Sequence, residues 1–277
     1  DYEELTRTRR LIMRSYRLPG NRLRLLHPNE NRGAVTIDEE RDYHFRYVLE
    51  DNFGNRRTYQ FIVKGKRQDI PEYKPEANEM LYWNRTNVIQ KPGMELVVPR
   101  YYVYEDVPLR TDMRGDSSHI TFDYILDAGR TPIHSYCDLS IGLRHMPVAD
   151  TTKYYIVQKA GKWRSSMGGK YANGWIKTRV RSLGTFSVDV DTIAPQITPI
   201  GQGGWRTSRN IRFRIKDMES GIGSYKVYID GKFVLFGLKK GILAIQDPEK
   251  VKKGVPHKLE VTVTDQCGNM TRKEYKF

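Results

Sequence analysis

A two-residue alternation of apolar and polar side chains recurs along the chain and constrains its fold more than any other feature. It is clearest in residues 211–215, 225–229 and 259–263. Successive side chains of a β-strand point to opposite faces, so this pattern predicts strands with one buried and one wet face. Asp230-Gly231 separates two such runs and predicts a hairpin, because both turn positions need a positive φ.

The spacing of these strands predicts an all-β protein built from tandem immunoglobulin-like β-sandwich domains. A polar stretch with two prolines and no apolar period indicates a linker near residue 70. The predicted units are residues 1–65, a β-sandwich domain or only its C-terminal part; residues 66–80, a linker; residues 81–190, a middle β-sandwich domain; and residues 191–277, a C-terminal immunoglobulin-like β-sandwich domain.

A weak internal repeat supports this division. Residues 43–63 and 257–277 both consist of a strand pattern, a D-x-x-G-N segment and a second strand pattern. The aspartate can accept hydrogen bonds from the backbone ahead of it, and the glycine supplies a left-handed position. We expect the same turn to join the last two strands of a sandwich at both places. Residues 1–65 are few for a whole sandwich, so we expect further chain ahead of Asp1.

The chain is basic, with 47 lysines and arginines against 33 acidic residues and a net charge of +14. Such a surface suits anionic surroundings, although it also serves solubility alone. No apolar run reaches the roughly 18–20 residues of a membrane-spanning helix. The two cysteines, Cys137 and Cys267, are predicted to be small buried core residues rather than a disulfide or a catalytic thiol.

Four acidic residues near the entry to the last domain are candidates for a calcium site between two sandwiches: Asp189, Asp191, Asp217 and Glu219. Calcium prefers carboxylate and carbonyl oxygens, but the dense D-x-D-x-D string of a dedicated loop is missing here.

Three tryptophans are candidates for ligand binding because aromatic faces can stack on sugar rings: Trp163, Trp175 and Trp205. Core packing and cross-strand aromatic pairs explain such residues more simply. The arginine-rich start of the chain carries no recognisable nucleic-acid-reading motif, so nucleic acid is not an expected partner.

Local catalytic motifs are missing from the sequence. It contains no H-E-x-x-H, H-x-H, C-x-x-C or G-x-S-x-G pattern. His119 and Asp123 have the spacing of a zinc pair, but on a strand their side chains would lie roughly 13 Å apart. We therefore predict no catalytic residue, no metal held by a local motif and no cofactor in this chain.

Several segments in order resemble a known family: residues 8–12, 17–20, 37–43, 171–186, 191–195, 220–222, 229–233 and 263–269. They are similar to the region downstream of the catalytic domain in bacterial envelope proteins that begin with a lysostaphin-type (LytM-like) zinc metallopeptidase. The resemblance implies a non-catalytic immunoglobulin-like region of a peptidoglycan endopeptidase. Zinc is then expected only in a missing upstream peptidase domain, which would bind it through H-x(3)-D and H-x-H motifs.

The resulting expectation is an accessory, spacer or docking region of a cell-wall peptidase. Its expected partner is peptidoglycan or another anionic envelope polymer, and its expected location is periplasmic, in the cell envelope or secreted. The alternative is a carbohydrate-binding or cell-adhesion module. A hidden enzyme with a site assembled from distant residues is a further alternative.

Overall fold

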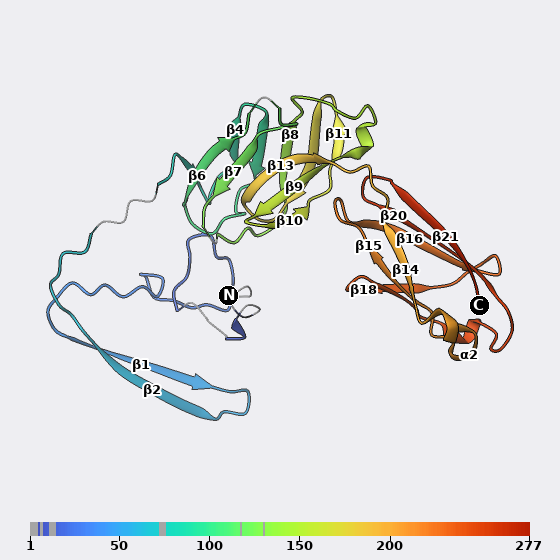
Figure 1. Ribbon diagram of the computed structural model, residues 1–277. Coiled ribbons are helices and arrows are strands. Elements are labelled where there is room, and N and C mark those ends of the chain that lie inside the picture. The colour runs from blue at the N-terminus through green and yellow to red at the C-terminus, as the bar shows by residue number, and fades with distance from the viewer. Residues whose placement is uncertain (1–4, 6–7, 11–14, 72–75, 117, 130) are drawn as a thin grey trace. The chain divides into compact units, whose positions relative to one another are not determined.

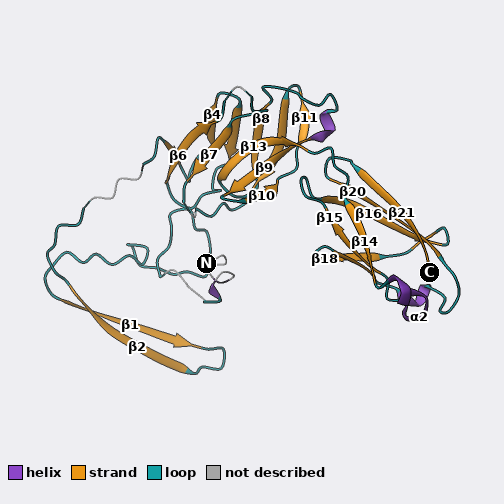
Figure 2. Ribbon diagram, viewed as in Figure 1, coloured by secondary structure: helices purple, strands orange, loops and turns teal. Residues whose placement is uncertain are grey.

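The structure is a computed structural model that describes residues 5, 8–10, 15–71, 76–116, 118–129 and 131–277. Antiparallel strands dominate it, and helical segments are short (Figure 2). The predicted all-β class is therefore confirmed. The chain divides into two compact units, Asp1–Glu76 and Ala77–Phe277, a boundary that lies inside the predicted linker.

The first unit contains one long hairpin, formed by β1 (Asp42–Glu50) and β2 (Arg56–Lys64). The two strands pair antiparallel without a register shift along their whole length. At the base, the Tyr43 hydroxyl accepts hydrogen bonds from the amides of Asp38 and Glu39 and donates one to Asp38. The sandwich predicted for residues 1–65 is represented among the described residues by this hairpin alone.

The second unit begins with a sandwich of two sheets (Figure 1). The six-stranded sheet has the order β10-β9-β13-β7-β6-β3, and the five-stranded sheet has the order β11-β12-β8-β5-β4. Their strands are β3 (Glu79–Leu81), β4 (Asn87–Lys91), β5 (Met94–Val98), β6 (Val107–Arg114), β7 (Asp123–Asp127), β8 (Cys137–Gly142), β9 (Tyr154–Ala160), β10 (Trp163–Ser166), β11 (Lys170–Ala172), β12 (Trp175–Val180) and β13 (Gly184–Val190). The 3-10 turn η1 (Thr151–Lys153) precedes β9.

The core of this middle sandwich follows the two-residue period of its strands. In β12, for example, Ile176 and Val180 are buried while Lys177 and Arg179 are exposed. The largest buried side chains include two tyrosines whose hydroxyls find backbone partners, which avoids the cost of an unpaired buried polar group. Tyr124 donates to the carbonyl of Pro92, and Tyr154 donates to that of Val148.

The last sandwich packs two four-stranded sheets, with the orders β14-β15-β19-β18 and β17-β16-β20-β21. Its elements are β14 (Gln196–Ile200), η2 (Gln202–Gly204), α2 (Trp205–Ser208), β15 (Arg212–Lys216), β16 (Ile222–Ile229), β17 (Lys232–Phe233), β18 (Phe236–Lys239), β19 (Ile242–Ile245), η3 (Pro248–Lys250), β20 (Lys258–Asp265) and β21 (Met270–Lys276). The turn between β16 and β17 holds Asp230 and Gly231 at φ of 50° and 77°, so the predicted hairpin is confirmed.

Both cysteines are buried free thiols, as the sequence predicts. Burial raises the pKa of Cys137 to about 12 and that of Cys267 to about 11, which keeps both thiols protonated near neutral pH. Among the described residues, none of the helices is long and apolar enough to cross a membrane.

Candidate metal centre at the junction of two sandwiches

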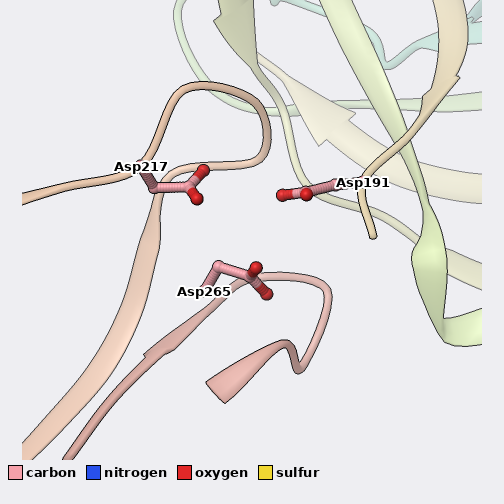
Figure 3. A group of neighbouring side chains, drawn as sticks. All are labelled: Asp191, Asp217 and Asp265. Carbon is pink, nitrogen blue, oxygen red and sulfur yellow. The ribbon is translucent and has the colours of Figure 1, made fainter. Parts of the chain in front are cut away.

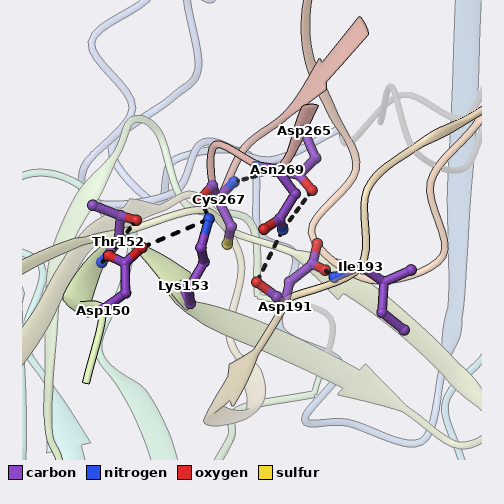
Figure 4. A network of polar contacts seen from close by, with 8 residues as sticks. All are labelled: Asp150, Thr152, Lys153, Asp191, Ile193, Asp265, Cys267 and Asn269. Atoms are coloured by element: carbon purple, nitrogen blue, oxygen red, sulfur yellow. Dashed lines mark hydrogen bonds and ion pairs between the residues drawn. The ribbon is translucent and has the colours of Figure 1, made fainter. Parts of the chain in front are cut away.

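The middle and last sandwiches meet at a junction built from backbone carbonyls and a few long side chains (Figure 4). Asp191 follows the last strand of the middle sandwich, and its backbone amide donates to the carbonyl of Lys153. The Lys153 ammonium donates a hydrogen bond to the backbone carbonyl of Cys267 at 3.0 Å. The side-chain amide of Asn269 donates one to the backbone carbonyl of Asp191, also at 3.0 Å. These bonds tie the turn after β20 to the end of the middle sandwich.

An apolar contact lies beside this polar network. Successive side chains of β9 point to opposite faces of the sheet. Tyr154 and Ile156 point into the core of the middle sandwich, so Tyr155 and Val157 point away from it. Nevertheless Tyr155 and Val157 are buried, and they cluster with Cys267 of the last sandwich. Covering an otherwise exposed sheet face in this way excludes water from the joint and stabilises it.

Three carboxylates converge at the same junction (Figure 3). Asp191 follows β13, Asp217 follows β15 and Asp265 ends β20, and one carboxylate oxygen of each lies within 4.8 Å of the others. Asp191 and Asp265 are buried, whereas Asp217 is partly exposed. Two aspartates from loops and one from the end of a strand therefore bring carboxylate oxygens close together, and of the three only Asp217 is partly exposed.

Backbone amides, rather than cationic side chains, orient these carboxylates. Asp191 accepts from the amides of Ile193 and Ser220, and Asp217 accepts from those of Glu219 and Gly221. None of the ion pairs found among the described residues involves any of the three aspartates.

The electrostatics of Asp265 reflect this concentration of negative charge. Burial raises the pKa of Asp265 above its ordinary value, and the nearby charge of Asp191 raises it further. Hydrogen bonds from Asn269 and Cys267 act in the opposite direction but do not outweigh burial. A divalent cation would relieve the repulsion, and calcium suits a set of carboxylate oxygens.

The structure brings together two of the four acidic residues that the sequence suggests, Asp191 and Asp217, whereas Asp189 and Glu219 are not part of this group and have other partners. Asp189 lies on β13 and forms an ion pair with Arg164 of β10. Glu219 accepts a hydrogen bond from the Tyr155 hydroxyl at 3.3 Å. The sequence does not single out Asp265 as a site residue, although its D-x-x-G-N segment predicts the turn that contains it.

The three candidate tryptophans have different surroundings. Trp163 is 80% exposed on β10, the edge strand of the six-stranded sheet. Trp175 is half-buried on the outward face of β12, where its ring lies against Gly142 of β8. Trp205 is a correction: it is fully buried, packs against Phe213 and donates to the carbonyl of Ile200, so it cannot present its ring to a ligand.

Comparisons with known proteins find a family match for one part of the chain. A family model described as a Zu5-like domain matches residues 78–191, the middle sandwich together with Asp191. Among solved structures, a polysaccharide lyase aligns with 83% of this chain and 38% of its own, at 8% identity and a TM-score of 0.21. The chain therefore spans well under half of that protein, and so low a TM-score supports no argument about function. No curated protein matches the chain.

Proposed function

We propose that the chain is a non-catalytic accessory region that holds an attached envelope hydrolase against a carbohydrate-containing polymer. The observation that carries this proposal is the junction between the middle and last sandwiches. Asp191 is fully buried there, and direct bonds from Lys153 and Asn269 cross between the two sandwiches. A flexible connection would need none of these contacts, so the two sandwiches act as one arm that sets reach and orientation.

The basic surface gives this arm a means of staying near its target. A net charge of +14 raises the local concentration of the chain near an anionic polymer such as peptidoglycan. In this proposal the attached enzyme is a lysostaphin-type peptidase with zinc in its own domain, and the protein works in a periplasm, in a cell envelope or outside the cell. Calcium at Asp191, Asp217 and Asp265 would stiffen the joint.

Cosedimentation of the whole chain, residues 1–277, with purified peptidoglycan tests this proposal. We expect binding that weakens as salt rises, because exposed charges are screened. We also expect no release of soluble fragments from the polymer, with or without added zinc. Salt-independent binding, no binding at all, or cleavage of peptidoglycan by this chain would each contradict the proposal.

A second candidate, a carbohydrate-binding module, is favoured by the aromatic residues of the middle sandwich. Trp163 is largely exposed, and Trp175 lies on an outward face next to Lys177 and Arg179 of the same strand.

If a glycan stacks on these rings, Trp163→Ala or Trp175→Ala should weaken glycan binding about tenfold, equivalent to roughly 1.4 kcal/mol. Phe233→Ala is the matched control, because Phe233 is 60% exposed on the last sandwich. Equal effects of all three substitutions would argue against a specific site.

A further inference from the structure

The hairpin β1–β2 has one apolar face and one largely polar face. The register places aromatic and aliphatic side chains opposite one another on the first face: Tyr43, Phe45, Tyr47, Leu49, Tyr59, Phe61 and Val63. Phe45 and Phe61 stack with their ring centroids 5.0 Å apart. The opposite face carries mostly charged and amide side chains. This division is typical of a strand pair at the surface of a sandwich, with its apolar face toward a core.

The apolar face of this hairpin is nevertheless open. Only Tyr43, at the base, is buried, and exposure rises toward the turn, where Leu49 is 65% and Tyr59 is 63% exposed. An isolated two-stranded hairpin is marginally stable in water. The described residues 15–41 and 65–71 contribute no strand that could extend the sheet or face it.

The hairpin β20–β21 of the last sandwich has the same turn. Asp51 accepts from the amides of Phe53 and Asn55 at 2.8 and 3.0 Å and from the Asn55 side chain at 2.8 Å. Asp265 accepts the corresponding three bonds, at 2.8 Å each, from Cys267 and Asn269. Gly54 and Gly268 take the left-handed position at φ of 82° and 80°. The repeat in the sequence is therefore a repeat in structure.

The matched positions show what covers such a face. Phe45, Tyr47 and Leu49 correspond to Leu259, Val261 and Val263, which are all fully buried. Phe61 corresponds to Tyr275, whose ring lies 5.4 Å from that of Phe213 on β15 of the facing sheet. In the last sandwich, the cover is thus a second sheet of the same domain, which contributes apolar and aromatic side chains.

We propose that β1–β2 is the final hairpin of another immunoglobulin-like sandwich, and that its apolar face is covered by strands encoded ahead of residue 1 in the same polypeptide. Those strands would supply a facing sheet with an apolar inner face and a neighbour strand equivalent to β16. This inference does not depend on the proposed function, because it rests on the hairpin and its repeat alone.

Amide hydrogen exchange tests the proposal by comparing the chain of residues 1–277 with the same chain extended by its gene-encoded upstream residues. In the shorter chain we expect rapid exchange in β1–β2 and slow exchange in β20–β21. In the extended chain we expect exchange at Tyr47 and Tyr59 to slow by at least about a hundredfold. The molar mass of both proteins is also measured in solution to establish whether they are monomers.

Two neighbouring substitutions in the extended chain sharpen the test. Phe61→Ser lies on the apolar face and should abolish the added protection, whereas Ile62→Ser, on the opposite face and 51% exposed, should leave it unchanged. Slow exchange in a monomer of residues 1–277, slow exchange only in a self-associated form, or no slowing in the extended chain would each overturn the proposal. A gene that encodes no upstream strands would also overturn it.

Discussion

The turns at Asp51 and Asp265 have the same sequence pattern and the same hydrogen bonds, yet their carboxylates have opposite electrostatics. Hydrogen bonds from Asn55 and Phe53 lower the pKa of the exposed Asp51. Burial raises the pKa of Asp265, even though Asn269 and Cys267 provide equivalent bonds. The local sequence therefore determines the backbone of the turn, whereas the packing around it determines what its carboxylate can do.

The difference also separates a structural turn from a candidate site. At Asp51 the carboxylate only organises its own loop. At Asp265 the same loop lies against the end of the middle sandwich, and its Asn269 side chain also donates to the carbonyl of Asp191. A turn that closes a hairpin thus acquires a second task when another sandwich packs on it.

Removing the carboxylate of Asp265 is expected to have the largest effect on stability. Asp265→Ala leaves the buried backbone amide of Cys267 and the partly buried one of Asn269 without their acceptor, so it should lower the free energy of unfolding of the last sandwich by about 2–4 kcal/mol. Asp51→Ala should have a much smaller effect, because water can replace its exposed bonds. Urea denaturation gives the free energies, and amide exchange assigns them to each hairpin. Equal losses at the two turns would show that burial is not the deciding factor.

The second largest effect is expected from calcium, which should bind at the turn of Asp265 but not at the turn of Asp51. If it binds the three aspartates, a concentration about 100 times the dissociation constant stabilises the fold by about 2.7 kcal/mol. Thermal unfolding with calcium and with a chelator measures this shift. Asp191→Asn and Asp217→Asn should remove it, while Asp51→Asn should not. A shift that survives in the Asp217→Asn variant, or none in the unsubstituted chain, would exclude a site at this junction.

The sequence predicts the strands well, because the two-residue period reports directly which side chains face a core. It also predicts the hairpin at Asp230-Gly231, because that turn depends on local backbone preferences. Trp205 could not be placed in this way. It lies in the four-residue helix α2, which is too short to show a period, and only the packing of β15 and β21 around it reveals that it is buried.

The candidate site was only half predictable for a related reason. Asp191 and Asp217 lie near the domain entry in the sequence, but Asp265 joins them only because the fold brings the end of β20 to the segments that follow β13 and β15. Asp189 is two residues from Asp191, but it faces Arg164, and that pairing depends on the register of β9, β10 and β13. Such long-range register cannot be read from one segment at a time.

A smaller effect is expected from the lysine that crosses the junction. Lys153→Met keeps most of the aliphatic chain but removes the bond to the Cys267 carbonyl, which should cost about 1 kcal/mol. Lys162→Met on the exposed turn between β9 and β10 is the control and should change nothing measurable. Urea denaturation of both variants checks this. Equal stability of the two variants would mean that the lysine bond contributes nothing to the joint.

The smallest effect is a difference in pH dependence, measured without calcium. The folded pKa of Asp265 lies above its ordinary value of 3.8, so the stability contributed by its protonated form is lost as the pH rises through that pKa. The folded pKa of Asp51 lies below 3.8, so its contribution is lost only as the pH falls through that lower value. Carboxyl carbon NMR shifts should give titration midpoints on opposite sides of 3.8 for the two residues.

Asp191→Asn removes the neighbouring charge and should move the titration midpoint of Asp265 downward while leaving that of Asp51 unchanged. If both midpoints fell on the same side, the environment would not override the hydrogen bonds that the two turns share.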